Sequence, residues 1–375
     1  MSYTRFISFF IPILLSTMYF LMAMPPAYRL IAYSLIVIFF ISLLPLFFNV
    51  FYEGELLVNS KVFTLLFFLT LLLFKDIVFF ISGDSALISI VMSGFEVLFF
   101  FCLIILYHSN DLEKIMHRTF KLAAILSAIS LAIYFIADFK LSSYNFYAAL
   151  MCPLFVYYAC NRKLGILQMF FMLFILLLSI LFDARAATII IALSVMVYFT
   201  RDYLNNLNII FLILFIVFLF LQYYIQSENS LLYNELLTYR PTIWNFYFEE
   251  SMKEFWYGHG AISSDATIGA AEAYGENVGR GVAESYGTQS MYIAYFYSSG
   301  IIGVFFVIVL ILLAFSKNNK FTLGLFIYSL IGLIETIKVG SISVYGLPLT
   351  LFIFLTLSEF NEDLSTTEFS DVEVK

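Results

Sequence analysis

The sequence predicts an all-α fold, a polytopic bundle of transmembrane helices, and three observations support this prediction. Hydrophobic residues occupy 62% of the 375 positions. Charged residues occupy only 12% of them, which is about half the fraction usual in a soluble domain. Long apolar runs recur along the chain, among them 6–20, 30–50 and 207–225, and a run of about 20 residues is long enough to cross a hydrocarbon core as a helix.

The apolar runs divide the chain into four parts. Residues 1–225 carry spans one to nine, 226–288 form a hydrophilic insertion, 289–358 carry spans ten to twelve, and 359–375 form an acidic tail. The first run has no small-residue cleavage site, so we expect it to remain as the first span. The predicted spans, about twelve in number, lie at 5–22, 28–48, 62–81, 86–107, 119–137, 146–160, 164–182, 186–200, 207–225, 289–314, 321–339 and 343–358.

Basic residues predict the orientation of the bundle. If the N-terminus is cytoplasmic, the loops on that side are richer in Lys and Arg than the opposite short loops, as the positive-inside rule requires. An even number of spans then places the C-terminal tail in the cytoplasm and the insertion 226–288 on the outer side. The basic residues of the inner loops are Lys114, Arg118, Lys121, Arg162, Lys163, Arg201, Lys317 and Lys320.

The insertion is about 60 residues long, far beyond what a helix hairpin needs, so we expect it to have a function of its own. Its first part, 234–260, has aromatic and apolar residues at helical spacing and predicts a short helix at the membrane surface. Its second part, 261–287, is rich in Gly, Ala and Ser. We expect this second part to be mobile until a ligand binds.

Charged residues inside the predicted spans need partners, because an unpaired charge at that depth costs at least about 2.5–3.5 kcal/mol. Spans three and four contain Lys75, Asp76 and Glu96. Lys75 and Glu96 come to similar depth in an antiparallel hairpin, which predicts an ion pair that fixes the helix register, with a proton or ion relay as the alternative. Glu335 and Lys338 lie three residues apart on span eleven and predict a second structural pair.

Three arginines lie on the outer side in this topology, where basic residues are not expected. Arg185 directly precedes span eight, and Arg240 and Arg280 lie in the insertion. A guanidinium is always charged and binds phosphate with two parallel hydrogen bonds, so we predict a phosphate or pyrophosphate ligand at the outer headgroup level. The alternatives are that Asp183 simply neutralises Arg185 and that single arginines reach toward lipid headgroups.

Motifs of nucleotide-dependent and metal-dependent enzymes are absent from the sequence. It has no P-loop, no glycine-rich dinucleotide motif, no HExxH and no Asp-x-Asp. Cys102, Cys152 and Cys160 lie within or beside apolar runs and have no metal-ligand spacing, so we expect them to be packing residues. We therefore expect no cofactor, no metal and no nucleic-acid partner. An activated lipid pyrophosphate, whose departure arginine stabilises without a metal, stays open as the donor.

Four stretches carry a family likeness. SYNFYAALMCPLFVYYACNRK (143–163) opens a span with Asn and ends it with basic residues, and LSILFDARAATIIIALSVMV (178–197) begins a span with Arg between small residues. RPTIWNFYFEESMKEFWYGHG (240–260) has Arg, then Trp, then Gly-x-Gly, and SYGTQSMYIAYFYSSGIIGVFF (285–306) returns to the membrane. With its span count and late outer loop, the chain resembles the O-antigen polymerase and O-antigen ligase superfamily of bacterial inner membranes.

The resemblance implies a metal-independent glycosyltransferase of lipopolysaccharide or similar polysaccharide biosynthesis. Such a polymerase transfers the growing chain from undecaprenyl pyrophosphate to another lipid-linked repeat unit on the periplasmic side. The implied partners are the undecaprenyl-pyrophosphate-linked oligosaccharide, membrane lipid and a chain-length regulator protein. Ligases have a His-Asn-type motif where this chain reads Thr288-Gln289-Ser290, which favours a polymerase. Against this, Ser251 stands where some polymerases have a glycine after the position of Arg240.

The implied reaction needs a cation for the departing diphosphate and a base for the attacking hydroxyl. By the resemblance, Arg185 and Arg240 are assigned to the diphosphate, with Arg280 as a further substrate contact. His259, between two glycines, is the candidate base because imidazole titrates near neutral pH, although a histidine between glycines is also typical of a turn. The alternative bases are the carboxylates of the insertion, Glu249, Glu250, Asp265, Glu272, Glu276 and Glu284.

Three further residues are assigned to substrate binding. Asp183 lies beside Arg185, and Trp244 and Tyr257 are candidates for stacking on sugar faces, with membrane anchoring as the alternative role of such aromatic residues.

A lipid-oligosaccharide flippase or other transporter is the competing class, and a structural or regulatory membrane protein is a third. A transporter needs polar residues along a path through the bundle, whereas here they gather on the outer side.

Overall fold

The computed structural model describes residues 3–22, 24, 26–52, 67, 70, 74, 77, 81, 87–107, 112–137, 144–161, 163, 165–182, 184–200, 206–227, 240–260, 264–273, 288–316, 319–337, 339 and 341–358. Every regular element in this part of the chain is an α-helix, which confirms the predicted all-α class. The twelve spans and the outer loop remain predictions. The first helices are α1 (Tyr3–Met22), α2 (Pro26–Tyr52), α4 (Leu87–Tyr107) and α5 (Leu112–Ala137).

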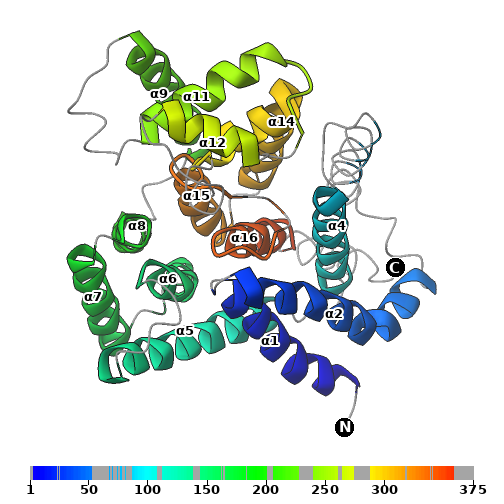
Figure 1. Ribbon diagram of the computed structural model, residues 1–375. Helices are drawn as coiled ribbons and strands as arrows, with labels where there is room; N and C mark the ends of the chain where they lie inside the picture. Colours follow the sequence, from blue (N-terminus) through cyan, green and yellow to red (C-terminus); the bar gives the residue numbers. More distant parts are fainter. Residues whose placement is uncertain are drawn as a thin grey trace, which may run out of the picture.

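The remaining helices surround or belong to a central group. They are α6 (Tyr144–Cys160), α7 (Ile166–Leu181), α8 (Arg185–Thr200), α9 (Leu207–Ser227), α11 (Arg240–Lys253), α12 (Ser264–Ala273), α14 (Met291–Phe315), α15 (Thr322–Ile331) and α16 (Gly346–Ser358). Helix α6 packs against α5 and α8, and α15 packs against α16. Most side chains of α6, α15 and α16 are buried. These three helices therefore form the centre, and the others lie around them (Figure 1).

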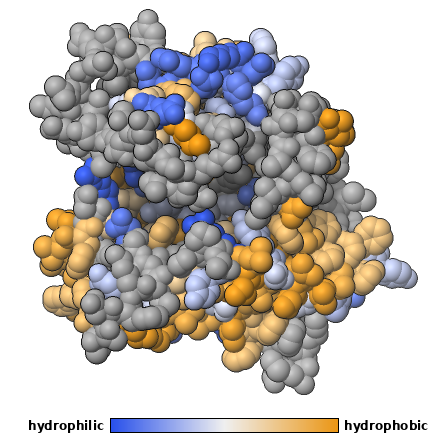
Figure 2. All heavy atoms as spheres, viewed as in Figure 1, coloured by the Kyte–Doolittle hydropathy of each residue, from blue (hydrophilic) through white to orange (hydrophobic). Residues whose placement is uncertain are grey.

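The composition and surface of the described helices indicate a membrane protein. Tyr28–Asn49, Leu112–Phe135 and Met291–Phe315 are each long and apolar enough to cross a bilayer, and several shorter helices are also apolar. Helix α7 exposes most of its large hydrophobic side chains, and its buried residues are Met172, Ile175 and Ser179. Hydrophobic residues cover α7, α5 and α2 in Figure 2, whereas hydrophilic residues gather over α11 and α12. Lipid is the natural environment of such an apolar surface.

Helix α15 is shorter than the predicted span 321–339, and the described residues between it and α16, namely 332–337, 339 and 341–345, form a non-helical segment. The reason lies at Gly332, whose carbonyl accepts a hydrogen bond of 2.7 Å from the backbone N–H of Met291 at the start of α14. A Cβ at this position would lie 2.8 Å from the Met291 side chain. The close approach of α14 thus ends the helix, and Glu335 lies in the non-helical segment and not on a helix.

The insertion contains two helices in its described part. Helix α11 begins at Arg240, inside the stretch predicted to hold a short helix. Helix α12 packs against it, with Gly269 next to the Phe246 ring and Ala270 fully buried. The prediction of a mobile segment therefore did not anticipate a packed helix at 264–273. Residues 274–287, with Arg280, lie outside the described residues.

A backbone junction holds the end of α11 against a kink in α14. Gly300 breaks α14 with φ 61°, and Gly258 has φ 69°. The His259 N–H donates to the carbonyl of Tyr297 at 2.7 Å, and the Ile301 N–H donates to the carbonyl of Phe255 at 2.8 Å. A Cβ on either glycine would come within 2.6 Å of backbone atoms of the other segment. This junction orients α11 and so places its first residue.

Candidate functional site

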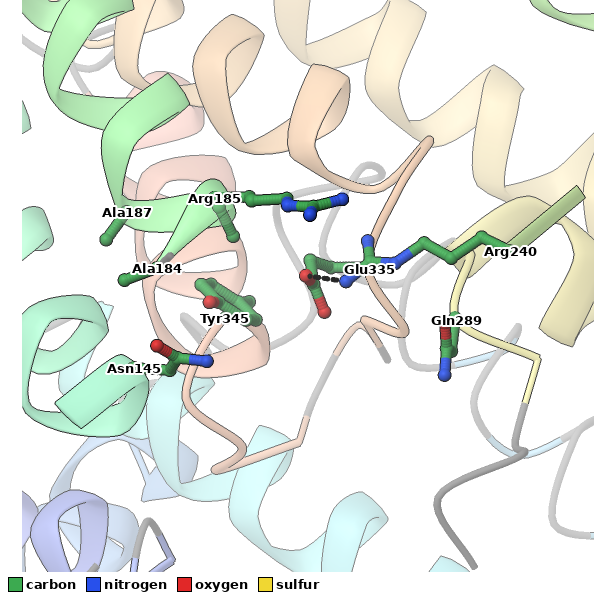
Figure 3. A pocket seen from close by; sticks show the side chains of 9 residues that line it. Asn145, Ala184, Arg185, Ala187, Arg240, Gln289, Glu335 and Tyr345 are labelled. Carbon is green, nitrogen blue, oxygen red and sulfur yellow. Dashed lines mark hydrogen bonds and ion pairs between the residues drawn. The ribbon is translucent and has the colours of Figure 1, made fainter. Parts of the chain in front are cut away.

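A cavity of about 260 Å³ lies where several helices begin. The segments that line it are far apart in the sequence, and the close-up shows their side chains around one space (Figure 3). The lining residues are Asn145, Ala184, Arg185, Ala186, Ala187, Arg240, Gln289, Glu335 and Tyr345.

Five helix N-termini converge on this cavity. Asn145 is in the first turn of α6, Arg185 begins α8 and Arg240 begins α11. Gln289 stands directly before the N-cap of α14, and Tyr345 directly precedes α16. The first turn of a helix has N–H groups without helical acceptors and carries a partial positive charge. This arrangement favours an anionic ligand, as helix N-termini do in phosphate sites generally.

Arg240 is held at the cavity by two contacts with the non-helical segment between α15 and α16. Its Nη2 forms an ion pair with Oε1 of Glu335 at 2.9 Å, and its Nη1 donates a hydrogen bond to the carbonyl oxygen of Ile334. Pro241 follows in the first turn of α11, where the missing N–H of a proline leaves no helical hydrogen bond unmade. The side chains of Arg240 and Glu335 are each 20% exposed, so the pair borders the cavity without being open to bulk solvent.

Arg185 approaches the same space from the opposite side. Its side chain is half-buried, and its guanidinium is directed toward Arg240 and Glu335 in Figure 3. The neighbours of Arg185 in the first turn of α8 are alanines, and the Ala187 carbonyl lies 3.9 Å from the Cys152 sulfur of α6. Small residues permit this close packing of α8 on α6, and they leave room for the arginine to extend into the cavity.

Gln289 has a left-handed backbone conformation, with φ 46°, which is uncommon for a residue other than glycine. Hydrogen bonds hold the backbone at Gln289 and at the nearby Met291. The indole N–H of Trp244 donates to the Gln289 carbonyl at 3.2 Å, and Met291 is bound to Gly332. A backbone held in a sparsely populated conformation is frequent at ligand sites. Here the conformation directs the Gln289 side chain to the cavity, beside Arg240.

Glu335 is the carboxylate of the cavity. Burial raises the pKa of its carboxyl group, and the charge and hydrogen bond of Arg240 oppose that rise. Arg240 binds Oε1, and among the described residues none donates a hydrogen bond to Oε2. The cavity therefore combines two guanidinium groups with one carboxylate, two amides from Asn145 and Gln289, and the phenol of Tyr345.

The other residues predicted from the sequence lie away from the cavity or outside the described residues. The ring of His259 stacks on Tyr297 with centroids 5.0 Å apart, and its Nε2 lies 2.7 Å from the Glu250 carbonyl oxygen. The side chain of Trp244 is 1% exposed and supports Gln289, whereas Tyr257 is 66% exposed on the surface. Asp183, Arg280 and Lys338 lie outside the described residues, as does the Lys75 partner predicted for Glu96.

Sequence reasoning paired Glu335 with Lys338 and so missed its position at the cavity. The described partner of Glu335 is Arg240, which lies 95 residues away in the sequence. A carboxylate within an apolar stretch is by itself a sign of a functional site, and this signal was present. Asn145 and Gln289 were both inside quoted family stretches, but nothing local assigned them to one site.

The two arginines and the helix N-termini can neutralise a diphosphate, and the carboxylate can accept a proton.

Comparisons of the chain with protein-family models, with curated proteins and with solved structures found no match in any of the three.

Proposed function

We propose that this protein is a membrane glycosyltransferase that polymerises lipid-linked glycan repeat units. It transfers the growing chain from undecaprenyl pyrophosphate to a second lipid-linked unit on the periplasmic side of the bacterial inner membrane. The observation that carries the proposal is the convergence of Arg185 and Arg240 with five helix N-termini on one cavity. The resemblance to the O-antigen polymerase and ligase superfamily supports the same assignment.

The size of the cavity suits a diphosphate headgroup. Pockets for drug-sized ligands usually have volumes of about 300–1,000 Å³, and this cavity of about 260 Å³ lies just below that range. It accommodates a diphosphate and part of the first sugar, while the remaining glycan and the prenyl chain stay outside. The exposed apolar faces of the surrounding helices are compatible with a prenyl chain that lies in lipid.

The arginines act on the leaving group in this proposal. Negative charge grows on the diphosphate as its bond to the sugar breaks, and two guanidiniums with helix N-termini stabilise that charge. Because the forked guanidinium binds two phosphate oxygens at once, lysine is a poor replacement. The acceptor hydroxyl also needs a base. His259, the candidate from the sequence, does not line the cavity.

The test is a complementation experiment in a strain that lacks the gene. Cells carrying Arg185→Ala or Arg240→Ala should make surface polysaccharide with single repeat units and no long ladder on a gel. Arg118→Ala is the matched control, because Arg118 bonds the Ser8 carbonyl of α1 and lies away from the cavity. Antibody detection in isolated membranes checks that each variant is inserted.

The gene deletion itself separates the competing functions. Single repeat units attached to lipid A support a polymerase, whereas free polymer without attachment indicates a ligase. Loss of both single units and polymer indicates a flippase. Normal long ladders from inserted Arg185→Ala and Arg240→Ala variants contradict the proposed role of the cavity.

A further inference from the structure

The ion pair between Arg240 and Glu335 gives Arg240 two competing partners. Its Nη2 binds the carboxylate of Glu335. If a diphosphate occupies the cavity, the same guanidinium faces a ligand with more negative charge and more acceptor oxygens. Its Nη1 bond to the Ile334 carbonyl does not depend on Glu335. Arg240 can thus stay at the cavity while Nη2 changes partner.

We propose that the donor diphosphate takes Arg240 from Glu335, and that the released Glu335 carboxylate accepts the proton of the attacking hydroxyl. This inference rests on the proposed function. Donor binding then makes Glu335 a stronger base, because its carboxylate loses the contact with Nη2 of Arg240 when the leaving group is in place.

The surroundings of Glu335 support the exchange. Among the described residues, the charged and titratable groups that share its cavity are Arg185 of α8, Arg240 of α11 and Tyr345 before α16. A guanidinium in contact with a carboxylate makes it a weaker base, and a nearby anion makes it a stronger one. The loss of the Arg240 contact and the arrival of the diphosphate therefore both make Glu335 a stronger base. Arg185 lines the same cavity from α8 and is placed to bind the diphosphate from the other side.

The reaction step is balanced without a further reagent. The acceptor oxygen forms a bond to the anomeric carbon, and the bond from that carbon to the diphosphate oxygen breaks. The electron pair leaves with the lipid diphosphate, where Arg185 and Arg240 stabilise it. The hydroxyl proton passes to Glu335. When the lipid diphosphate departs, Glu335 loses the proton to water and forms its ion pair with Arg240 again.

The pH dependence of the purified wild-type protein tests the exchange without any variant. The substrate is the lipid-linked repeat unit extracted from the deletion strain, and the protein is held in lipid nanodiscs. The acidic limb of kcat/KM reports ionisation in the free protein, and that of kcat reports it in the complex. We expect the limb of kcat at higher pH than that of kcat/KM. Coincident limbs would overturn the exchange.

Glu335→Gln tests the role as a base. This variant should bind inorganic pyrophosphate as tightly as the wild type or more tightly, because nothing competes for Arg240. Its rate of transfer should fall by about 10²–10⁴-fold, as expected for a lost general base. Glu335→Asp should restore part of the rate with a displaced acidic limb. Glu113→Gln is the matched control, because Glu113 belongs to an ion pair away from the cavity.

The outcomes separate this inference from the proposed function. Undiminished transfer by Glu335→Gln removes the base assignment but leaves the polymerase proposal intact. Undiminished pyrophosphate binding and transfer by both arginine-to-alanine variants remove the polymerase site itself. Loss of pyrophosphate binding by Glu335→Gln would show that the carboxylate only positions Arg240, and it would overturn the role as a base.

Discussion

Two ion pairs at opposite ends of the central helices have similar chemistry and different surroundings. Arg240 and Glu335 meet beyond the end of α15, at the start of α6 and α16. Lys320 and Glu113 meet just before α15, with Nζ and Oε2 3.1 Å apart. Both pairs join residues that are distant in the sequence. The difference between them indicates what separates a ligand site from a structural contact.

In the Lys320–Glu113 pair both carboxylate oxygens are bound. Lys320 binds one carboxylate oxygen of Glu113, and the Tyr157 hydroxyl donates to the other at 2.9 Å. The Tyr157 ring in turn stacks on His117 and on Phe321. Tyr157 comes from the C-terminal end of α6, and Glu113 lies in the first turn of α5, where the helix dipole favours its charge. This cluster therefore closes the packing of α5, α6 and α15.

The Arg240–Glu335 pair leaves capacity for a ligand. Only one of its carboxylate oxygens is bound among the described residues, and the pair borders a cavity surrounded by helix N-termini. The same kind of ion pair thus has a structural role where both carboxylate oxygens are bound within the packing. It can serve recognition where it borders a cavity with positive helix ends.

The largest expected effect on the rate of transfer comes from removing the cavity arginines, compared with breaking the Lys320–Glu113 pair. Arg240→Ala or Arg185→Ala should lower the rate of transfer by about 10²–10³-fold, the typical effect of removing one group that stabilises a developing anion. Lys320→Ala should change the rate little, because partly exposed ion pairs contribute about 0–1 kcal/mol. Transfer is measured with extracted lipid-linked units in nanodiscs, and size-exclusion chromatography checks folding. Equal losses from both pairs would remove the distinction between them.

The second prediction concerns the junction that places α11 and therefore Arg240. Gly300→Ala should destabilise the protein by about 1–3 kcal/mol or more, because its left-handed backbone disfavours a side chain. The added Cβ would also lie 2.3 Å from backbone atoms of Trp256. Gly94→Ala is the control, since a Cβ there meets nothing within 4 Å. Thermal unfolding of the purified proteins measures both, and equal midpoints would contradict the role of the junction.

The third prediction distinguishes charge from geometry in the cavity. Arg240→Lys keeps the charge but loses the fork that contacts Glu335 and the Ile334 carbonyl together. We expect about tenfold weaker binding of inorganic pyrophosphate, the equivalent of about 1.4 kcal/mol or one charge-assisted hydrogen bond. Isothermal titration of the nanodisc protein measures it. Lys320→Arg, which changes the other pair in the reverse sense, should leave the binding unchanged.

The helical class and the candidate residues Arg185 and Arg240 were predictable from the sequence, because each depends on a local sequence pattern. A long apolar run reports a buried or lipid-facing helix wherever it packs. Arg185 and Arg240 stand out because the positive-inside rule does not favour cations on the predicted outer side. The orientation itself stays a prediction, but the prominence of these residues did not depend on knowing the fold.

The rest of the site was not predictable, because it depends on contacts between distant segments. Glu335 had Lys338 at helical spacing, but α15 ends at Ile331 and Glu335 contacts Arg240 from the distant α11, while Lys338 lies outside the described residues. His259 was the candidate base because imidazole titrates near neutral pH, whereas its neighbouring glycines were typical of a turn. In the structure Gly258 and Gly260 serve the backbone junction with α14, and the ring of His259 stacks on Tyr297. The glycines were a true signal, but of a close backbone approach.

The smallest predicted effect comes from Trp244, which contacts the cavity only through Gln289. Trp244→Phe keeps most of the packing in its buried cluster but removes the N–H that bonds the Gln289 carbonyl. A lost neutral hydrogen bond costs about 0.5–1.5 kcal/mol, so pyrophosphate should bind about two- to tenfold more weakly. The pH limbs should stay in place, because no ionisable group changes. A displaced limb would mean that Trp244 acts on Glu335 and not through Gln289. In that case a side chain without direct contact to Glu335 would influence its ionisation. The Lys320–Glu113 pair differs, because there the Tyr157 hydroxyl bonds the carboxylate directly.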